Sequence, residues 1–224
     1  MKTELVIFDL DGTLVNTIAD LASATNHALT EGGYPTHHMS AYPFYVGNGV
    51  TKLIERALPS EARYDDEIER VRRFFKEYYD EHLTDASTPY AGIPELLHEL
   101  QARGIKLAVA SNKYQSAVER IIGYFFPEIE WAAVEGQKSG VPVKPDPSVV
   151  FQVLLKSPAA KDSVLYAGDS GVDLETAWRA GVESVGGTWG FRPESELAEN
   201  NACNIISSPA QLLDIIETKN SKIL

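Results

Sequence analysis

The sequence predicts an α/β fold, in which helices cover both faces of a parallel sheet and a helical domain is inserted after the first strand. Three observations support this prediction. Short apolar runs alternate with helical periodicity in the last 140 or so residues, about 70 residues near the start show helical patterns alone, and the ends of the apolar runs carry polar side chains. With 224 residues, 44% of them hydrophobic, the chain is long enough to bury a sizeable core.

The first predicted strand is the apolar, β-branched run 5–8, which two carboxylates follow at Asp9 and Asp11. Residues i and i+2 of an extended chain point the same way, so we expect these carboxylates to lie close together. One of them must then be neutralised by a proton or a cation. Taken alone, the run that ends in Gly12 and Thr13 is also typical of an ordinary Asp-Gly turn.

The helical insertion is predicted from apolar positions at helical spacing in residues 17–31, where Gly32-Gly33 marks a helix end. A turn at 45–49 separates this helix from a second one, and a third is expected over 64–83. We therefore expect a helical cap domain over residues 15–85, and a core domain made of residues 1–14 and 86–224.

Strand and helix patterns alternate through the rest of the core. After a linker at 89–94, helices are expected at 94–103, 115–124, 148–156, 173–180 and 209–218, and strands at 105–110, 131–136, 164–167, 182–185 and 203–206. Such alternation predicts βαβ units and a Rossmann-like parallel sheet. Ligands bind at the carboxyl ends of the strands in such sheets, so one edge should gather the polar residues that follow them. These are Asp9, Asp11, Ser111, Asn112, Lys144 and Asp169.

Charge and composition limit the possible partners. The net charge of −12 argues against a nucleic acid or an anionic membrane as partner, although a small anion can still bind at a local positive site. No apolar run approaches the ~20 residues of a membrane-spanning helix, and the first strand follows Thr3 too closely for a signal peptide. The single cysteine, Cys203, is expected to be a buried apolar residue. These features predict a cytoplasmic protein.

Four motifs occur in a fixed order along the chain. They are Phe8-Asp9-Leu10-Asp11-Gly12-Thr13, Ser111-Asn112-Lys113, Lys144-Pro145-Asp146-Pro147 and Gly168-Asp169-Ser170-Gly171-Val172-Asp173. Together they resemble the motifs of the haloacid dehalogenase-like (HAD) phosphohydrolase superfamily, and the resemblance extends from residue 4 to about residue 191. It implies a parallel-sheet core with an inserted helical cap and hydrolysis of a phosphate ester.

Acidic residues at strand ends form an oxygen-rich site of the kind that Mg²⁺ prefers, and no His/Cys cluster has zinc spacing. The resemblance implies that Mg²⁺ is held by the side chains of Asp9 and Asp169 and by the backbone carbonyl of Asp11. It also implies that Asp173 orients the metal-bound waters. Asp173 is equally the kind of residue that caps a helix, and the two roles can coexist.

The catalytic roles follow from the same residues. A carboxylate can be a nucleophile, and we expect Asp9 to form an aspartyl-phosphate. Asp11 is expected to be the general acid and base, with a pKa raised by the neighbouring charge of Asp9. Lys144 should screen the charges of Asp9 and the phosphate. The expected phosphate-binding residues are Thr13, Ser111 and Asn112, although a Ser-Asn pair is also common in turns; Asp146 is left without a role.

The cap turn of Gly47, Asn48 and Gly49 resembles the cap loop of phosphoglycolate phosphatases, and so does the stretch 188–191. This implies a small phosphorylated metabolite, 2-phosphoglycolate above all, as substrate. The glycines are also typical of a plain helix-linking turn, and Trp189 is as well suited to packing as to shaping a pocket.

Several alternatives stay open. The chain could be a pyrophosphatase or a β-phosphoglucomutase-like mutase, although mutases usually carry another residue at the Thr13 position. A catalytically silent regulatory protein would be expected to lack at least one of Asp9, Asp11, Lys144 and Asp169. Dehalogenases lack the second aspartate, so Asp11 disfavours carbon–halogen chemistry. Either a monomer or a homodimer is compatible with the sequence.

Overall fold

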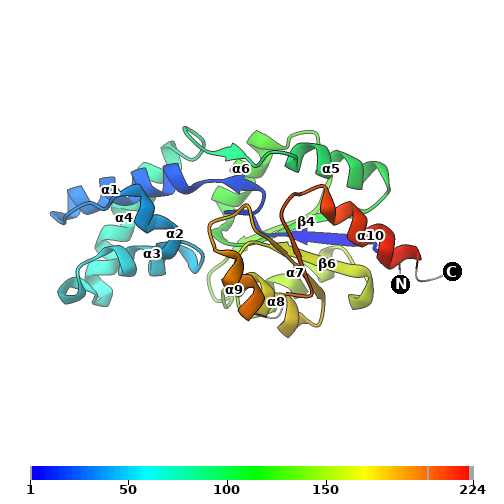
Figure 1. The fold of residues 1–224 in the computed structure, drawn as a ribbon. Coiled ribbons are helices and arrows are strands. Elements are labelled where there is room, and N and C mark those ends of the chain that lie inside the picture. Colours follow the sequence, from blue (N-terminus) through cyan, green and yellow to red (C-terminus); the bar gives the residue numbers. More distant parts are fainter. Residues whose placement is uncertain (1, 201, 222–224) are drawn as a thin grey trace.

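The core of the computed structural model, which describes residues 2–200 and 202–221, is a six-stranded parallel sheet (Figure 1). Its strand order is β5-β4-β1-β6-β7-β8, and every neighbouring pair is parallel. The strands are β1 (Leu5–Phe8), β4 (Lys106–Tyr114), β5 (Trp131–Gln137), β6 (Val164–Gly168), β7 (Glu183–Gly187) and β8 (Asn204–Ile206). The α/β fold predicted from the alternating patterns is confirmed.

Helices cover both faces of the sheet (Figure 1). The alternation of β1 explains the two layers, because Val6 and Phe8 pack into one apolar cluster and Leu5 and Ile7 into the other. The first cluster includes residues of α5 (Ile93–Ala102), α6 (Gln115–Phe125) and α10 (Gln211–Ser221). The second includes residues of α7 (Ser148–Lys156) and α8 (Gly171–Ala180). β1 is therefore a central strand that is buried on both faces.

Four of the five α-helices between β1 and β4 lie beyond one end of the sheet (Figure 1), and we call residues 18–81 the helical segment. They are α1 (Ile18–Gly32), α2 (Tyr42–Tyr45), α3 (Gly49–Ala57) and α4 (Asp65–Glu81), with single-turn 3₁₀ helices at Met39–Ala41 and Ser60–Ala62. The predicted end of the first helix is confirmed, because Gly33 caps α1 with a φ of +81°.

The chain leaves and re-enters the core through two short strands. β2 (Val15–Asn16) and β3 (Thr88–Pro89) pair in antiparallel fashion, so the expected linker at 89–94 begins within a strand. The buried Asp20 carboxylate accepts hydrogen bonds from the backbone of Ala86 (2.9 Å) and Ser87 (2.8 Å) close to this pair. These contacts hold the two crossings side by side.

The structure differs from the sequence predictions in several places, one of which is the unpredicted short helix α2. β4 continues through Ser111, Asn112 and Lys113 to Tyr114, which pairs with β5 after an irregularity beyond Ala110. An unpredicted helix, α9 (Glu194–Glu199), follows β7, and a 3₁₀ turn at Lys161–Ser163 precedes β6.

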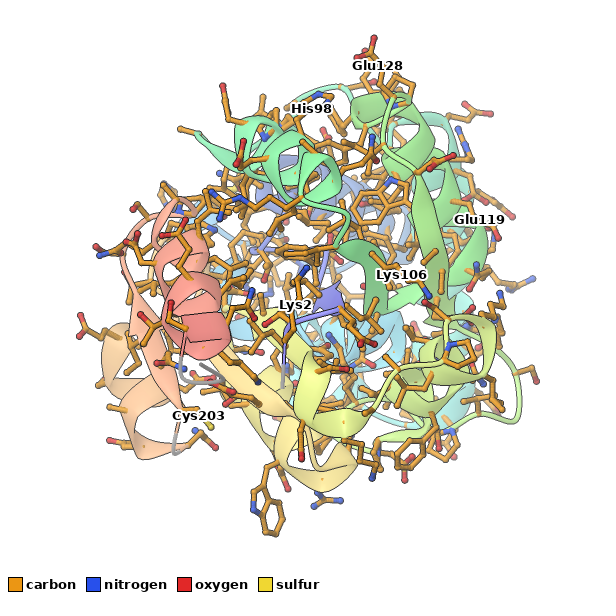
Figure 2. The ribbon with its side chains drawn as sticks, turned by 90° about the vertical axis from the view of Figure 1, so that its right-hand side faces the viewer. Lys2, His98, Lys106, Glu119, Glu128 and Cys203 are labelled. Atoms are coloured by element: carbon orange, nitrogen blue, oxygen red, sulfur yellow. The ribbon has the colours of Figure 1, made fainter. Side chains whose placement is uncertain are left out.

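The prediction that Cys203 is buried is wrong: it is exposed (Figure 2). It precedes β8, an edge strand that pairs on one side only, with β7, so little of the fold covers it. Among the described residues, no helix is both long and apolar enough to cross a membrane.

Candidate active site

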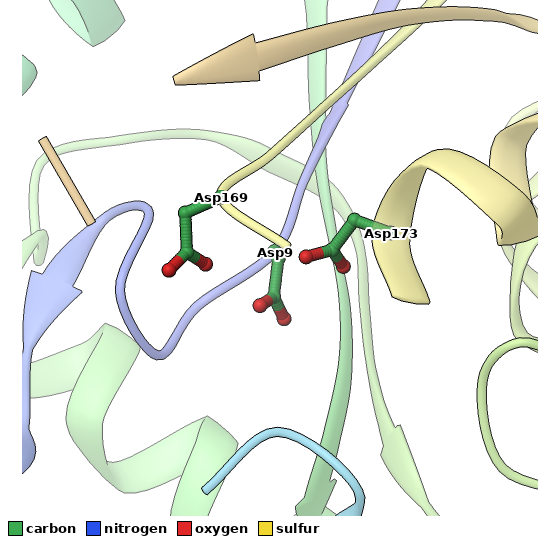
Figure 3. Close-up of side chains that lie close together, drawn as sticks. All are labelled: Asp9, Asp169 and Asp173. Carbon is green, nitrogen blue, oxygen red and sulfur yellow. The ribbon is translucent and has the colours of Figure 1, made fainter. Parts of the chain in front are cut away.

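Three buried carboxylates meet at the carboxyl ends of two neighbouring strands (Figure 3). Asp9 follows β1, Asp169 follows β6, and Asp173 lies in the first turn of α8. One oxygen from each lies within 4.8 Å of the others. Because β1 and β6 are parallel partners, their ends coincide and bring together residues that are 160 or so positions apart.

Lys144 connects two of these acids. Its Nζ lies 2.8 Å from Asp9 Oδ1 and 2.7 Å from Asp173 Oδ1. The carbonyl oxygen of Ala110 (3.0 Å) and the hydroxyl of Tyr166 (3.1 Å) complete its surroundings. With only 2% of its surface exposed, this ammonium is a fixed charge and not a solvated surface lysine.

Asp173 caps a helix as well as binding the lysine. Its Oδ2 accepts hydrogen bonds from the backbone N–H (3.2 Å) and the hydroxyl (2.6 Å) of Ser170, which form a capping box at the start of α8. Its Oδ1 accepts the bond from Lys144. The helix-capping role is therefore present, and orientation of metal-bound waters stays a prediction.

Burial, together with neighbouring acids, shifts the pKa values of Asp9 and Asp169 upward. Burial raises the pKa of Asp9 to about 7; the charge of Asp173 adds to the rise and Lys144 opposes it. Burial, followed by the charges of Asp173 and Asp9, raises the pKa of Asp169 well above its usual range. Burial alone would lower the pKa of Lys144, but the carboxylates of Asp173 and Asp9 raise it overall. The site thus holds more negative charge than its lysine neutralises.

The donor set fits a hard divalent cation. Three carboxylates and one ammonium leave excess negative charge, and Mg²⁺ prefers carboxylate oxygens and water. Asp169 is closely held, because it accepts hydrogen bonds from Phe191 N (2.7 Å) and the Thr13 hydroxyl (3.2 Å). A Cβ added at Gly12 or Gly190 would collide with its carboxylate, so backbone encloses it on both sides.

Asp11 has a separate environment. Its Oδ1 accepts a hydrogen bond from the Thr17 hydroxyl at 2.6 Å, and the Nζ of Lys113 lies 3.1 Å from the same oxygen. The Asp11 carboxylate is not part of the three-acid cluster, although Asp9 and Asp11 line one pocket. This is compatible with the expectation that Asp11 offers a metal its carbonyl oxygen and keeps its side chain for proton transfer.

The Asn112 side chain joins two loops. Its Nδ2 donates to the carbonyl oxygens of Gly47 (3.0 Å) and Lys144 (3.1 Å), and its Oδ1 accepts from the backbone N–H of Lys144 (2.7 Å). The amide therefore holds the Lys144 loop and connects it to the helical segment. In this arrangement it orders the site, and its predicted contact with phosphate would require one of these bonds to be exchanged.

The two predicted hydroxyl ligands of phosphate are placed differently. Ser111 lines the pocket, and its Oγ accepts a hydrogen bond from the backbone N–H of Lys113 at 3.2 Å, so its own proton can be donated to a ligand. Thr13 does not line this pocket, since its hydroxyl donates to Asp169. Its backbone N–H donates to the carbonyl oxygen of Leu10 at 3.3 Å, so the predicted contact of Thr13 with phosphate would require one of these bonds to be exchanged.

Gly47 and Gly49 form one wall of the pocket, and Asn48 does not. The φ angles of the two glycines, +115° and +82°, are ones that other residues rarely adopt. A Cβ at Gly49 would lie 3.3 Å from Gln137 Oε1, so the loop passes close to the core. Asn48 instead accepts a hydrogen bond from Arg56 at 2.8 Å, within the helical segment.

The pocket itself lies between the core and the helical segment. It is lined by Asp9, Asp11, Leu21, Val46, Gly47, Gly49, Val50, Leu53, Ser111, Asn112, Lys113 and Lys144. Lys113 lines the pocket although no role was predicted for it; its position directly after Ser111-Asn112 is the signal in the sequence that marks it. Sequence reasoning also missed Arg192, which donates to the carbonyl oxygen of Val46 at 3.0 Å, and no local pattern marked that contact.

Comparison with known proteins agrees with this geometry. The model of the haloacid dehalogenase-like hydrolase family matches residues 6–186. The chain is 33% identical to a phosphoglycolate phosphatase of Haemophilus influenzae (strain 86-028NP), over 95% of this chain and 98% of the relative. It is 32% identical to a phosphoglycolate phosphatase of Pasteurella multocida (strain Pm70), over 96% and 98%.

A crystal structure of a predicted phosphoglycolate phosphatase from Haemophilus somnus 129PT superposes with a TM-score of 0.88 at 31% identity, over 96% of this chain and 98% of the other. The chain belongs to the haloacid dehalogenase-like hydrolase family. Within that family it is similar to phosphatases, which are phosphoric monoester hydrolases.

Proposed function

We propose that this protein is a Mg²⁺-dependent phosphatase that hydrolyses 2-phosphoglycolate through an aspartyl-phosphate at Asp9. The observation that carries the proposal is the placement of Asp9, whose Oδ1 is held by Lys144 at 2.8 Å beside Asp169, at the base of a pocket that Asp11 also lines. The names of the relatives support the choice of substrate.

In the proposed first step, an Asp9 oxygen attacks phosphorus and the bond from phosphorus to the leaving oxygen breaks. Because Lys144 holds Oδ1, we assign the attack to Oδ2. Asp11 gives its proton to the leaving alkoxide, which departs as an alcohol. We assign the hydroxyl of Ser111, which lines the pocket, a hydrogen bond to the transferring phosphoryl group.

In the proposed second step, Asp11 takes a proton from water, whose oxygen attacks phosphorus. The bond between phosphorus and Asp9 breaks, which restores the carboxylate and releases inorganic phosphate. Asp9, Asp169 and the carbonyl of Asp11 would hold Mg²⁺, which when bound supplies positive charge that lowers the repulsion between Asp9 and the phosphate. Asp173 keeps Lys144 aimed at Asp9 through its 2.7 Å bond.

We assign the helical segment the role of a cap, within proposed boundaries at residues 15 and 85. It supplies Leu21, Val46, Val50 and Leu53 as apolar walls of the pocket, while the core supplies the charged residues. A cap in this position excludes water from the reaction and contacts the leaving group.

The test is release of inorganic phosphate from a panel that contains 2-phosphoglycolate, β-glucose 1-phosphate, pyrophosphate and nucleotides. We expect turnover of 2-phosphoglycolate to dominate, to require Mg²⁺ and to vanish in Asp9→Asn. Asp214 is an exposed aspartate on α10, and Asp214→Asn is the matched control, which should retain wild-type activity. Dominant turnover of pyrophosphate, or release that a chelator does not affect, would overturn the proposal.

A further inference from the structure

Lys113 is a buried cation to which the proposed reaction assigns no role. It lies near the end of β4, and only 3% of its side chain is exposed. Its Nζ donates to the Tyr79 hydroxyl at 2.9 Å and lies 4.8 Å from the centre of the Tyr79 ring. Since Tyr79 belongs to α4, this lysine reaches from the core into the helical segment.

Lys113 keeps donor capacity beyond its partners in the protein. Its ammonium pairs with the Asp11 carboxylate, whose Oδ1 lies 3.1 Å away and also accepts a hydrogen bond from Thr17 at 2.6 Å. An ammonium has three protons, and the Tyr79 hydroxyl and the Asp11 carboxylate take up at most two of them. Because Lys113 also lines the pocket, a donor remains for an acceptor on a ligand bound there.

The pocket combines two cations with apolar walls. Lys144 is held by Asp9 and Asp173, at the place assigned to the phosphate. Val46, Val50 and Leu53 form apolar walls, and Lys113 is the second of the two cations among the described pocket residues. A ligand that carries a phosphate near Asp9 would therefore place the rest of its structure between apolar walls and one ammonium.

We infer that Lys113 binds the carboxylate of the leaving group and makes the enzyme selective for short phosphate esters that carry an acid group. The inference rests on the proposed function, because it assumes that the phosphate lies at Asp9. Tyr79 is then a positioning residue, which holds the ammonium through its hydroxyl and ring face. The core and the cap thus meet at the group that recognises the leaving group.

The test compares two substrates, 2-phosphoglycolate and ethyl phosphate, which differ in the carboxylate, in wild type and in Lys113→Met. We expect kcat/KM for 2-phosphoglycolate to fall about 10- to 100-fold, the range for loss of a charge-assisted hydrogen bond, and that for ethyl phosphate to change by less than about threefold. If the methionine variant does not fold, Lys113→Gln replaces it in the test. Glutamine keeps a donor toward Tyr79, and we expect the same loss of selectivity. Lys106 is an exposed lysine at the other end of β4 (Figure 2), and Lys106→Met is the matched control, which should change neither value.

The outcomes separate the inference from the proposed function. If the wild type hydrolyses both substrates equally well, carboxylate recognition and the proposed substrate both fail. If the wild type prefers 2-phosphoglycolate and the Lys113 variants slow both substrates by the same factor, the lysine serves Asp11 instead. That result, with a changed pH profile of kcat, overturns the inference and leaves the proposed function intact.

Discussion

Replacement of Lys144 by methionine should destabilise the protein strongly in the absence of metal. The lysine ammonium contacts two buried carboxylates, Asp9 at 2.8 Å and Asp173 at 2.7 Å. Removing one partner of a buried ion pair leaves an uncompensated charge and costs about 3–5 kcal/mol. Methionine is close to lysine in length and apolar, so a cavity adds little. We therefore expect the free energy of unfolding to fall by about 3–5 kcal/mol at pH 8.5.

The loss should depend on pH in a defined direction. The pKa of Asp9 is about 7 in the folded protein, against 3.8 as the reference value for the unfolded chain, so the folded state binds the extra proton in that interval. The contribution of Asp9 to stability therefore decreases as pH rises from about 4 to 7 and then levels off. Without Lys144, which lowers the pKa of Asp9, the decrease should continue above pH 7, by about 1.4 kcal/mol for each unit of further shift.

The assay is equilibrium unfolding in urea, followed by circular dichroism at pH 6 and pH 8.5 with a chelator present. The difference between wild type and Lys144→Met should be larger at pH 8.5. Lys106→Met controls for loss of a lysine charge and should lower stability by less than about 0.5 kcal/mol. A difference below about 1 kcal/mol at pH 8.5, or one that is equal at both pH values, would refute the reasoning.

Two further predictions concern the metal and the cap loop. Mg²⁺ should bind about tenfold more weakly for each pH unit below 7, because Asp9 must lose its proton first. Titration calorimetry between pH 5.5 and 8 measures the affinity, and an affinity that does not change with pH would contradict the prediction. Gly49→Ala should cost about 1–2 kcal/mol from its φ of +82° and also lower kcat/KM, because the loop packs on the core. Gly33 has a similar φ of +81° and open space around it, so Gly33→Ala should lower stability and leave kcat/KM unchanged. Equal kinetic effects of the two variants would argue against a role for the loop.

Local patterns in the sequence determined the sheet and the positions of the chemical groups on it. The apolar, β-branched run 5–8 could only be a buried strand, and Asp9 had to leave its carboxyl end. The same reasoning placed Ser111, Lys144 and Asp169 at one edge, because parallel strands end together. These predictions depend on periodicity over a few residues, which a sequence displays directly.

Tertiary structure alone decided which partner each group has. Lys144 meets Asp9 across 135 positions of the chain, and Lys113 meets Tyr79 across 34. Asn112 is a bridge between loops, and Cys203 is exposed beside an edge strand. No local pattern encodes such contacts, because they depend on how the helical segment packs against the core and on which strand lies at the edge of the sheet. The residue types at the site can be read from the sequence, whereas their pairing and the resulting pKa shifts arise from burial and proximity in the folded chain.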